Sequence, residues 1–319
     1  MISSIIRRRL LQVIPVVIGS SFLTFFLVNL LPGSVVLTIL GPDATQSAIR
    51  SFDRQLGLNE PLLVRYGKWL YHAVQGQLGT SLLTAHQPVA HMVFQRLPVS
   101  VELVIAAIII ALVPAVLLSC FAARRPGGIL DRGLSVLSIL GVSTPNFVVA
   151  LGAIYLLADY RHLLPAIGFV PLATSVTGNL KSMVLPAGTL AVGLFSIYTR
   201  VLKADMTNQM LNEEYVNTAR TKGTRDWLII YRHVLRNSSF TLVTIVALNL
   251  GVLLGATVIL EQVFALPGVG SLLLEAINQR DEPVVEGVVL CLSTAVIFMS
   301  LLADVVYMLL DPRIRHGAS

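Results

Sequence analysis

Six long runs with almost no charged side chains restrict the fold of this sequence more than any other feature. A helix needs about 20 residues to cross the roughly 30 Å of hydrocarbon in a bilayer. The runs cover residues 10–31, 98–123, 134–158, 183–202, 237–260 and 287–310, and within them only Glu102, Arg200 and Asp304 carry charge. The sequence therefore predicts an all-α membrane protein with six transmembrane helices, which places both termini on the same side.

Composition excludes the main alternatives to a membrane protein. Hydrophobic residues make up 55% of the 319 positions and charged residues 13%, and the mean hydropathy is +0.79; soluble enzymes and disordered chains lie far from these values. Cys120 and Cys291 lie in apolar runs, so no disulfide scaffold or metal site is expected from them. The basic residues behind the net charge of +6 are scattered between the runs, so nucleic acid is not an expected partner.

The distribution of basic residues predicts the orientation. If the N-terminus is cytoplasmic, 15 of the 23 Lys and Arg residues fall on the cytoplasmic side, and five of the other eight lie in the long segment 32–97, which counts little in the positive-inside rule. Arg7, Arg8 and Arg9 precede the first run, but its 22 residues are too long for a signal-peptide core and no small-x-small cleavage site follows. We therefore expect an uncleaved first span and two cytoplasmic termini.

The runs divide the chain into four parts. Residues 1–31 are the expected cytoplasmic N-terminus and first span, residues 32–97 an external segment, residues 98–310 a core of five helices, and residues 311–319 a cytoplasmic tail. The external segment is long for a connector and contains Tyr66, Trp69 and Tyr71, which favours a small folded cap. The internal connector at 203–236 carries the clearest local signals.

That connector contains the signals of a short helix outside the membrane. Asn212 is placed to cap it, Glu213 and Glu214 fall in the first turn where the helix dipole favours acids, and Arg220 and Lys222 fall in the last turn. Gly223 follows as the expected stop, in a left-handed conformation that glycine adopts without strain. Four-residue spacing places Tyr215 with Ala219 on one face, and Glu214, Thr218 and Lys222 on the adjacent face.

A second helix is expected to start at Thr224, with Asp226 in its first turn. Two helices joined by a glycine turn and attached to two spans form a lever through which an internal partner moves the spans. A plain surface hairpin fits the same local signals equally well.

The connector resembles the cytoplasmic EAA loop of ABC importer permeases, in the form found in the dipeptide and oligopeptide branch. The matching residues are Glu214-Tyr215, Ala219, Lys222-Gly223 and His233-x-x-Arg236-Asn237. Other segments resemble the same branch: Leu56-Gly57-Leu58 with Pro61, Tyr66 and Trp69; Gly76-x-Leu78-Gly79-x-Ser81; Thr144-Pro145-x-Phe147; Glu261-x-Val263-Phe264; Pro267-Gly268-Val269-Gly270; Ala276, Arg280-Asp281 and Pro283; and Asp304, Tyr307 and Asp311-Pro312-Arg313-Ile314. The resemblance covers essentially the whole chain.

Two positions depart from the family pattern. Leu235-Arg236 stands where the wider group has Leu-Pro, which fits the peptide branch, and Gln77 stands where the branch commonly has an acid. The second departure removes any external contact made by that acid.

The resemblance implies the permease subunit of an ATP-driven importer in the bacterial cytoplasmic (inner) membrane. It implies dipeptide or oligopeptide cargo, with glutathione or a metal chelate as alternatives within the branch. The implied partners are a second, homologous permease, two ATPase subunits that carry ATP and magnesium, and an extracytoplasmic substrate-binding protein, besides membrane lipid. An ion-coupled secondary carrier is less favoured, because it needs charged groups near the bilayer centre and the middles of these spans are uncharged.

Two groups of site residues follow. For coupling to the ATPase they are Glu213, Glu214, Tyr215, Thr218, Ala219, Lys222 and Gly223, with Tyr215 filling a pocket of the ATPase and Ala219 allowing close approach. For an outer gate or substrate path they are Glu261, Phe264, Pro267, Gly268, Gly270 and Asp281. In the second group Glu261 ends an uncharged run before a turn-forming segment, where its carboxylate either meets a peptide amino group or simply lies at a capped surface helix end.

The chain is not expected to be an enzyme or to bind a cofactor or metal itself. Its only Gly-Lys pair, Gly67-Lys68, is followed by Trp69, so it has no phosphate-binding P-loop. The six histidines show no H-E-x-x-H spacing, and no G-x-S-x-G nucleophile motif occurs. ATP hydrolysis therefore has to come from a partner.

Overall fold

The computed structural model describes residues 2–30, 40–41, 44–55, 57, 59–84 and 86–310. In this part of the chain the secondary structure is helical, and strand-like pairing is limited to one isolated bridge between Thr80 and Pro88. The predicted all-α class is thus confirmed there. The tail 311–319, Leu56 and Leu58 lie outside the described residues, as do the side chains of residues 7–9, 304 and 307.

The chain divides into two compact units. The first unit consists of Met1–Ser100 with Pro267–Phe298, and the second of Val101–Leu266 with Met299–Ser319. Two long helices, α5 (Val89–Ala123) and α13 (Glu282–Leu310), contribute residues to both units. Segments from opposite ends of the sequence therefore fold together in the first unit.

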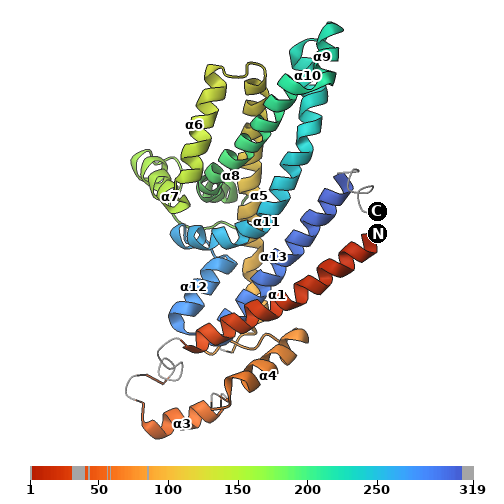
Figure 1. The fold of residues 1–319 in the computed structure, drawn as a ribbon. Helices are drawn as coiled ribbons and strands as arrows, with labels where there is room; N and C mark the ends of the chain where they lie inside the picture. Colours follow the sequence, from red (N-terminus) through yellow and green to blue (C-terminus); the bar gives the residue numbers. More distant parts are fainter. Residues whose placement is uncertain are drawn as a thin grey trace. The chain divides into compact units, whose positions relative to one another are not determined.

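In the first unit, aromatic side chains join α1 to α4. The helices are α1 (Ile2–Leu30), α3 (Gln46–Gln55), α4 (Leu62–Val74) and α12 (Val269–Gln279), with one end each of α5 and α13 (Figure 1). The ring of Tyr66 on α4 lies 5.2 Å from that of Phe22 and 5.5 Å from that of Phe25 on α1. Its hydroxyl donates to the carbonyl oxygen of Ile18 at 3.1 Å. The tyrosine of the predicted external segment thus fastens α4 to α1.

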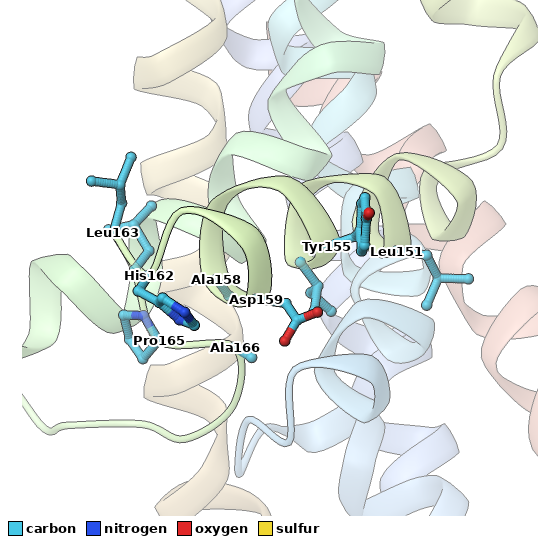
Figure 2. Close-up of a pocket in the computed structure, with 10 residues that line it drawn as sticks. Leu151, Tyr155, Ala158, Asp159, His162, Leu163, Pro165 and Ala166 are labelled. Atoms are coloured by element: carbon cyan, nitrogen blue, oxygen red, sulfur yellow. The ribbon is translucent and has the colours of Figure 1, made fainter.

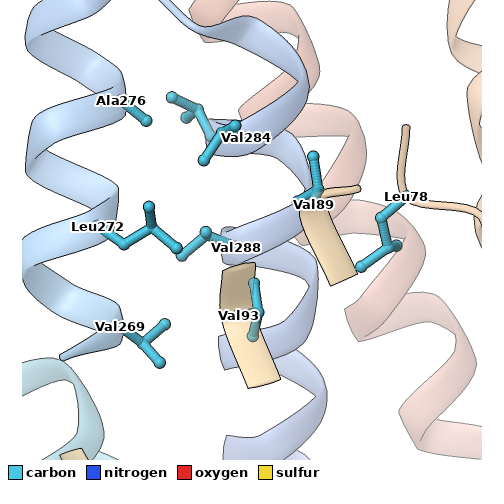
Figure 3. Packing of buried hydrophobic residues seen from close by; sticks show 9 residues of the cluster. Leu78, Val89, Val93, Val269, Leu272, Ala276, Val284 and Val288 are labelled. Carbon is cyan, nitrogen blue, oxygen red and sulfur yellow. The ribbon is translucent and has the colours of Figure 1, made fainter. Parts of the chain in front are cut away.

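The core of the first unit is built from α5, α12 and α13, together with Leu78 in the loop before α5 (Figure 3). Its buried members are Leu78, Val89, Val93, Val269, Leu272, Ala276, Val284, Val285 and Val288. At Gly287, helix α13 lies close to α5, because a Cβ atom there would lie 2.6 Å from Cγ1 of Val89. A larger residue at 287 would push α13 away from α5.

The second unit contains the rest of α5 and the elements between it and residue 266. They are α6 (Ile129–Ser143), α7 (Asn146–Ala153), the π-helical η1 (Ile154–Tyr160), α8 (Val176–Asn212), α9 (Glu214–Thr221), α10 (Asp226–Ile229), the π-helical η2 (Ile230–Val234) and α11 (Leu235–Val263). Helix α8 packs against α6, α7 and α11. Helices α9 and α10 lie at the end of the unit where α8 ends and α11 begins (Figure 1).

A polar contact fixes the register of α6 against α8. The ammonium group of Lys203 lies 2.7 Å from Oδ1 of Asp131 and donates to Oγ of Ser135 at 2.5 Å. Farther along the two helices, a Cβ atom on Gly141 would lie 2.0 Å from Oγ of Ser196. The absence of a side chain at 141 therefore lets the two helices meet.

The structure corrects the predicted third span. Residues 134–158 are not one straight helix: α6 and α7–η1 meet at residues 144–145 with a bend of 102°. Thr144 has an extended backbone (φ −90°, ψ 121°), the conformation that a following proline imposes because its ring collides with a helical predecessor. The Thr144-Pro145 pair thus ends one helix and starts another.

Within the described residues, four continuous helices are long and apolar enough to cross a membrane. They are Val89–Ala123, Val176–Asn212, Asp226–Val263 and Glu282–Ala303, and the bent pair adds a fifth span if it counts as one. Helix α1 adds a further apolar stretch, Ile14–Leu30, in the part of that helix whose side chains the structure describes. The chain is therefore a multi-pass membrane protein.

Candidate functional site

The structure places a short helix, α9, in the connector at 203–236, and each of its boundaries differs by one residue from the prediction. Asn212 does not cap it, because helix α8 continues to Asn212 and the extended residue before α9 is Glu213 (φ −87°, ψ 130°). The side chain of Glu213 makes no capping hydrogen bond to the start of α9. The next helix, α10, begins at Asp226 and has Arg225 at its N-cap position, whereas the prediction placed the start at Thr224.

Gly223 ends α9 as predicted, with a left-handed φ of +77°. Its amide donates to the carbonyl oxygen of Arg220 at 2.9 Å, and the amide of Thr224 donates to that of Ala219 at 3.1 Å. These bonds satisfy carbonyls that would otherwise lack partners at the helix end. Across the turn, Nε of Arg220 lies 3.1 Å from Oδ1 of Asp226, which joins α9 to α10.

Most of the predicted coupling residues lie on the exposed side of α9. Exposed side chains or backbone are found at Glu213, Glu214, Thr218, Lys222 and Gly223. Val216 is fully buried, while Tyr215 and Ala219 beside it are half-buried. The hydroxyl of Tyr215 is bonded inside the chain, and the insertion of this side chain into a pocket of a partner stays a prediction.

The partner of Tyr215 is a buried amide that the sequence did not single out. Gln209 on α8 is 4% exposed, and its Oε1 accepts from the Tyr215 hydroxyl at 2.6 Å and from Nδ2 of Asn237 at 3.1 Å. Its Nε2 donates to Oδ2 of Asp205 at 3.0 Å and to Oγ of Ser238 at 2.9 Å. Every donor and acceptor position of the amide is thus used, and Gln209 joins α9 to both α8 and α11.

Two residues predicted for the outer gate, Glu261 and Phe264, lie in the second unit and are buried. Glu261 is 0% exposed in the last turn of α11, so its carboxylate is neither at a surface helix end nor open to a ligand in this conformation. Phe264, just after the helix, is 2% exposed, and its carbonyl oxygen accepts from the amide of Gly168 at 3.3 Å. The backbone around both residues is fixed within the unit.

Three other residues predicted for the outer gate, Pro267, Gly268 and Gly270, lie in the first unit at the start of α12. Pro267 is exposed, whereas Gly268 and Gly270 are buried. Gly268 is the extended residue before the helix, and the next amide, that of Val269, donates to Oγ of Ser100 at 2.9 Å. This segment is therefore a helix start held by α5.

Asp281, predicted at the outer gate, holds a turn in this structure. Its Oδ2 accepts from the hydroxyl of Ser81 at 2.5 Å and its Oδ1 from the amide of Leu82 at 3.2 Å. Both Ser81 and Asp281 are buried, at 0% and 3% exposure. Two motifs separated by 200 positions, Gly79-x-Ser81 and Arg280-Asp281, are thereby brought together, and a Cβ atom on Gly79 would lie 3.5 Å from Cβ of Pro283.

Two pockets are found in the described part of the chain, and Asp281 lines one of them. One of about 660 Å³ follows η1 and is lined by polar Tyr155, Asp159 and His162 among apolar side chains (Figure 2). The other, about 190 Å³, lies beside α12 in the first unit, where Arg96 and Glu275 form an ion pair of 3.0 Å. In the part of the chain that the structure describes, no three His, Cys, Asp or Glu side chains are grouped to hold a metal ion.

Four helices long and apolar enough to cross a membrane, with the short polar helix α9 between two of them, are the features of a multi-pass membrane protein. The chain belongs to the family of binding-protein-dependent transport system inner membrane components, whose model matches residues 115–316. A second model, for the N-terminal part of such membrane components, matches residues 1–112. This confirms the resemblance to ABC importer permeases.

Similar proteins match over nearly their full length. A Brucella melitensis protein named as a permease of a peptide transport system is 34% identical over 99% of this chain and 100% of its own. A Sinorhizobium fredii protein named as a permease of a peptide ABC transporter is 33% identical over 98% of this chain and 99% of its own. The oligopeptide transport system permease protein AppB of Bacillus subtilis is 32% identical over 99% of this chain and 100% of its own.

Proposed function

We propose that this chain is a permease subunit through which an ABC importer takes up dipeptides or oligopeptides delivered by a substrate-binding protein. Full-length similarity to permeases named for peptide transport carries this proposal. Glutathione and metal chelates are the competing cargoes. In the working complex the chain pairs with a second, homologous permease, because a pathway through the bilayer has to be closed to lipid on all sides.

Helix α9 is the proposed coupling helix, seated on an ATPase subunit by its exposed side. That side presents Glu213, Glu214, Thr218 and Lys222, whose charged and hydroxyl groups suit ion pairs and hydrogen bonds with a polar groove. ATP and magnesium bind to two ATPase partners, and their closure moves α9. Because Gln209 ties α9 to α8 and α11, the movement passes to two helices of the permease at once.

The proposed topology has six spans, with both termini and the connector in the cytoplasm. It counts α1 and the bent α6–α7 pair as spans in addition to the four continuous helices. The external side then contains residues 32–97, residues 159–182 and the segment 261–286, so the buried Glu261 and Asp281 stabilise the external end of the pathway instead of binding cargo in this conformation.

Reconstitution of the complete transporter tests the proposal. Purified complex in vesicles, with its binding protein outside and ATP inside, is supplied with a labelled dipeptide, a labelled pentapeptide, glutathione or a metal chelate. We expect ATP-dependent accumulation of at least one peptide, unaffected by a protonophore. Accumulation of only glutathione or the chelate would reject the peptide cargo, and uptake that needs an ion gradient but no ATP would reject the ABC mechanism.

A further inference from the structure

Helix α5 has one buried face and one exposed apolar row within the second unit. On the buried side, Leu103, Ala107, Ala111, Ala115 and Ser119 follow one another at four-residue spacing, each 0% exposed. On the other side, Ile105, Ile109, Val113, Leu117 and Phe121 repeat at the same spacing and are 48% to 57% exposed. A continuous apolar row of this length on a spanning helix is the surface that lipid chains cover.

The row ends in an aromatic pair and a cation. The ring of Phe121 lies 5.5 Å from that of Trp227 on α10, and Cζ of Arg124 lies 5.8 Å from the centre of the Trp227 ring. Trp227 remains 44% exposed, and the nearby Leu228 and Tyr231 are 47% and 67% exposed. Apolar residues followed by tryptophan and then arginine are the order found where a helix leaves hydrocarbon for the headgroup region.

Positive charge at this end of α5 has no ion-pair partner among the side chains that the structure describes. Arg125 follows Arg124, Arg225 lies two positions before Trp227, and all three arginines are exposed. The nearest acids in sequence are already used, since Asp131 pairs with Lys203 and Asp226 pairs with Arg220. Among the described residues, no ion pair joins these three arginines to an acid.

We propose that Arg124 and Trp227 bind the headgroup of an anionic phospholipid in the leaflet where α5 ends and α6 begins. The guanidinium group donates to the lipid phosphate in a two-point contact that an ammonium group does not match. The acyl chains lie along the row from Phe121 to Ile105, and the indole sits at the level of the glycerol backbone. Anionic lipid is preferred over zwitterionic lipid because the ammonium group of the latter would be held beside several arginines.

This site differs from the coupling surface in position and partner, so it does not depend on the peptide cargo. It assigns α10 to the membrane interface and leaves the exposed side of α9 to the ATPase. The second permease is the other occupant that would fit an apolar row, and it would exclude lipid from Trp227.

The tryptophan content of the chain allows a direct test. Trp69 and Trp227 are the two tryptophans, so the full chain carrying Trp69→Phe reports on Trp227 alone. The protein is reconstituted into phosphatidylcholine vesicles that contain a minor fraction of phosphatidylglycerol. Either one lipid or the other is brominated near the headgroup end of its acyl chains, and quenching of the Trp227 fluorescence is measured.

We expect phosphatidylglycerol to be enriched about fivefold around Trp227 relative to its bulk fraction, the preference that one arginine near the lipid surface provides. Arg124→Gln should remove most of this enrichment, while Arg124→Lys should retain part of it. Arg161→Gln is the matched control, because Arg161 also lies over an aromatic ring, that of Tyr160 at 5.9 Å, but far along the chain from Trp227. Equal enrichment of the two lipids would overturn the anionic site, and no quenching by either lipid would show that Trp227 is covered by protein or lies in water.

Discussion

Tyr215 donates a hydrogen bond of 2.6 Å to Oε1 of Gln209, six positions earlier in the chain. The same amide bonds to Asn237 and Ser238 at the beginning of α11. Burial, and then the negative charge of Glu213, raise the pKa of the Tyr215 hydroxyl above its ordinary value. The hydroxyl therefore remains a protonated donor throughout the physiological pH range, and α9 stays attached to α8 and α11.

The first prediction concerns this amide. Gln209→Ala removes the amide from the buried Ser238 hydroxyl and the half-buried Tyr215 hydroxyl, at a cost of about 1–3 kcal/mol for a buried polar group left unpaired, and it frees α9 from α11. We expect uptake per ATP hydrolysed to fall roughly fivefold or more, while the ATPase still co-purifies. Uptake and ATP hydrolysis are measured together on the same reconstituted complex.

Two further variants separate coupling from general damage. Tyr215→Phe removes one bond of the network and should produce a smaller loss in the same ratio. Asn208→Ala changes the exposed neighbour of Gln209, whose side chain accepts a bond from Asn212 on the same helix, and should leave the ratio unchanged. A normal ratio in Gln209→Ala would show that the network does not transmit the motion.

The sequence predicted the connector helix but not this network, for a local reason. Residue 202 ends the apolar run, so the span was expected to stop there, yet residues 203–212 contain no glycine or proline and α8 continues through them. Gln209 then lies in the middle of a helical turn where a polar residue normally faces water. Only the position of α11, which no local pattern contains, buries it.

The second prediction concerns the turn after α9. At φ +77° a β-branched residue is strained, although no atom lies within 4 Å of a Cβ placed on Gly223. Gly223→Val should therefore cost about 1 kcal/mol or more through backbone strain alone, displace α9 and reduce ATPase co-purification.

Gly223→Asn is its control, because asparagine tolerates the left-handed conformation. The Asn variant should keep most of the bound ATPase and most of the uptake. If both variants retained as much ATPase as the unmodified complex, the turn would not position the coupling surface.

The third prediction concerns the buried pair of Ser81 and Asp281. Asp281→Ala removes the acceptor of the Ser81 hydroxyl and of the Leu82 amide, so we expect a loss of about 2–5 kcal/mol, the usual result of unpairing buried polar groups. Thermal unfolding of the purified chain should show a clear fall in the midpoint.

A double-mutant cycle identifies the cause. Ser81→Ala should destabilise less, and the two changes together should cost less than the sum of the single changes, because they remove the same bond. Glu275→Ala, on the exposed side of α12, breaks only the surface ion pair with Arg96 and should change stability by about 1 kcal/mol or less. Strict additivity of the Ser81 and Asp281 changes would argue against the pair.

The motifs of this pair are visible in the sequence, but their contact is not. Gly79-x-Ser81 and Arg280-Asp281 are 200 positions apart, and each on its own fits a turn on a loop surface. Arg280 ends α12 in a left-handed conformation (φ 60°). The sequence does not predict this conformation, because the position is occupied by arginine and not by glycine. The bend at Thr144-Pro145 could be predicted from the sequence, because a residue before proline is biased away from helix. The uncharged run of 25 residues, however, favours one continuous span.

The last prediction tests the number of spans through the side on which the loops lie. In a chain carrying Cys120→Ala and Cys291→Ala, single cysteines are introduced at the exposed positions Ser47, Thr174 and Thr221. Cells are treated with a membrane-impermeant maleimide before and after permeabilisation.

With six spans, Ser47→Cys and Thr174→Cys label from outside, and Thr221→Cys labels only after permeabilisation. Helix α8 separates Thr174 from Thr221, so these two positions differ whatever the bent pair does. Because each crossing reverses the side of the chain and α5 crosses once, Ser47 and Thr174 share a side only if the α6–α7 pair crosses as well. Labelling of Ser47→Cys and Thr221→Cys from outside, with Thr174→Cys protected, would show that α6–α7 enters and leaves the membrane on the same side, and the six-span topology would be wrong.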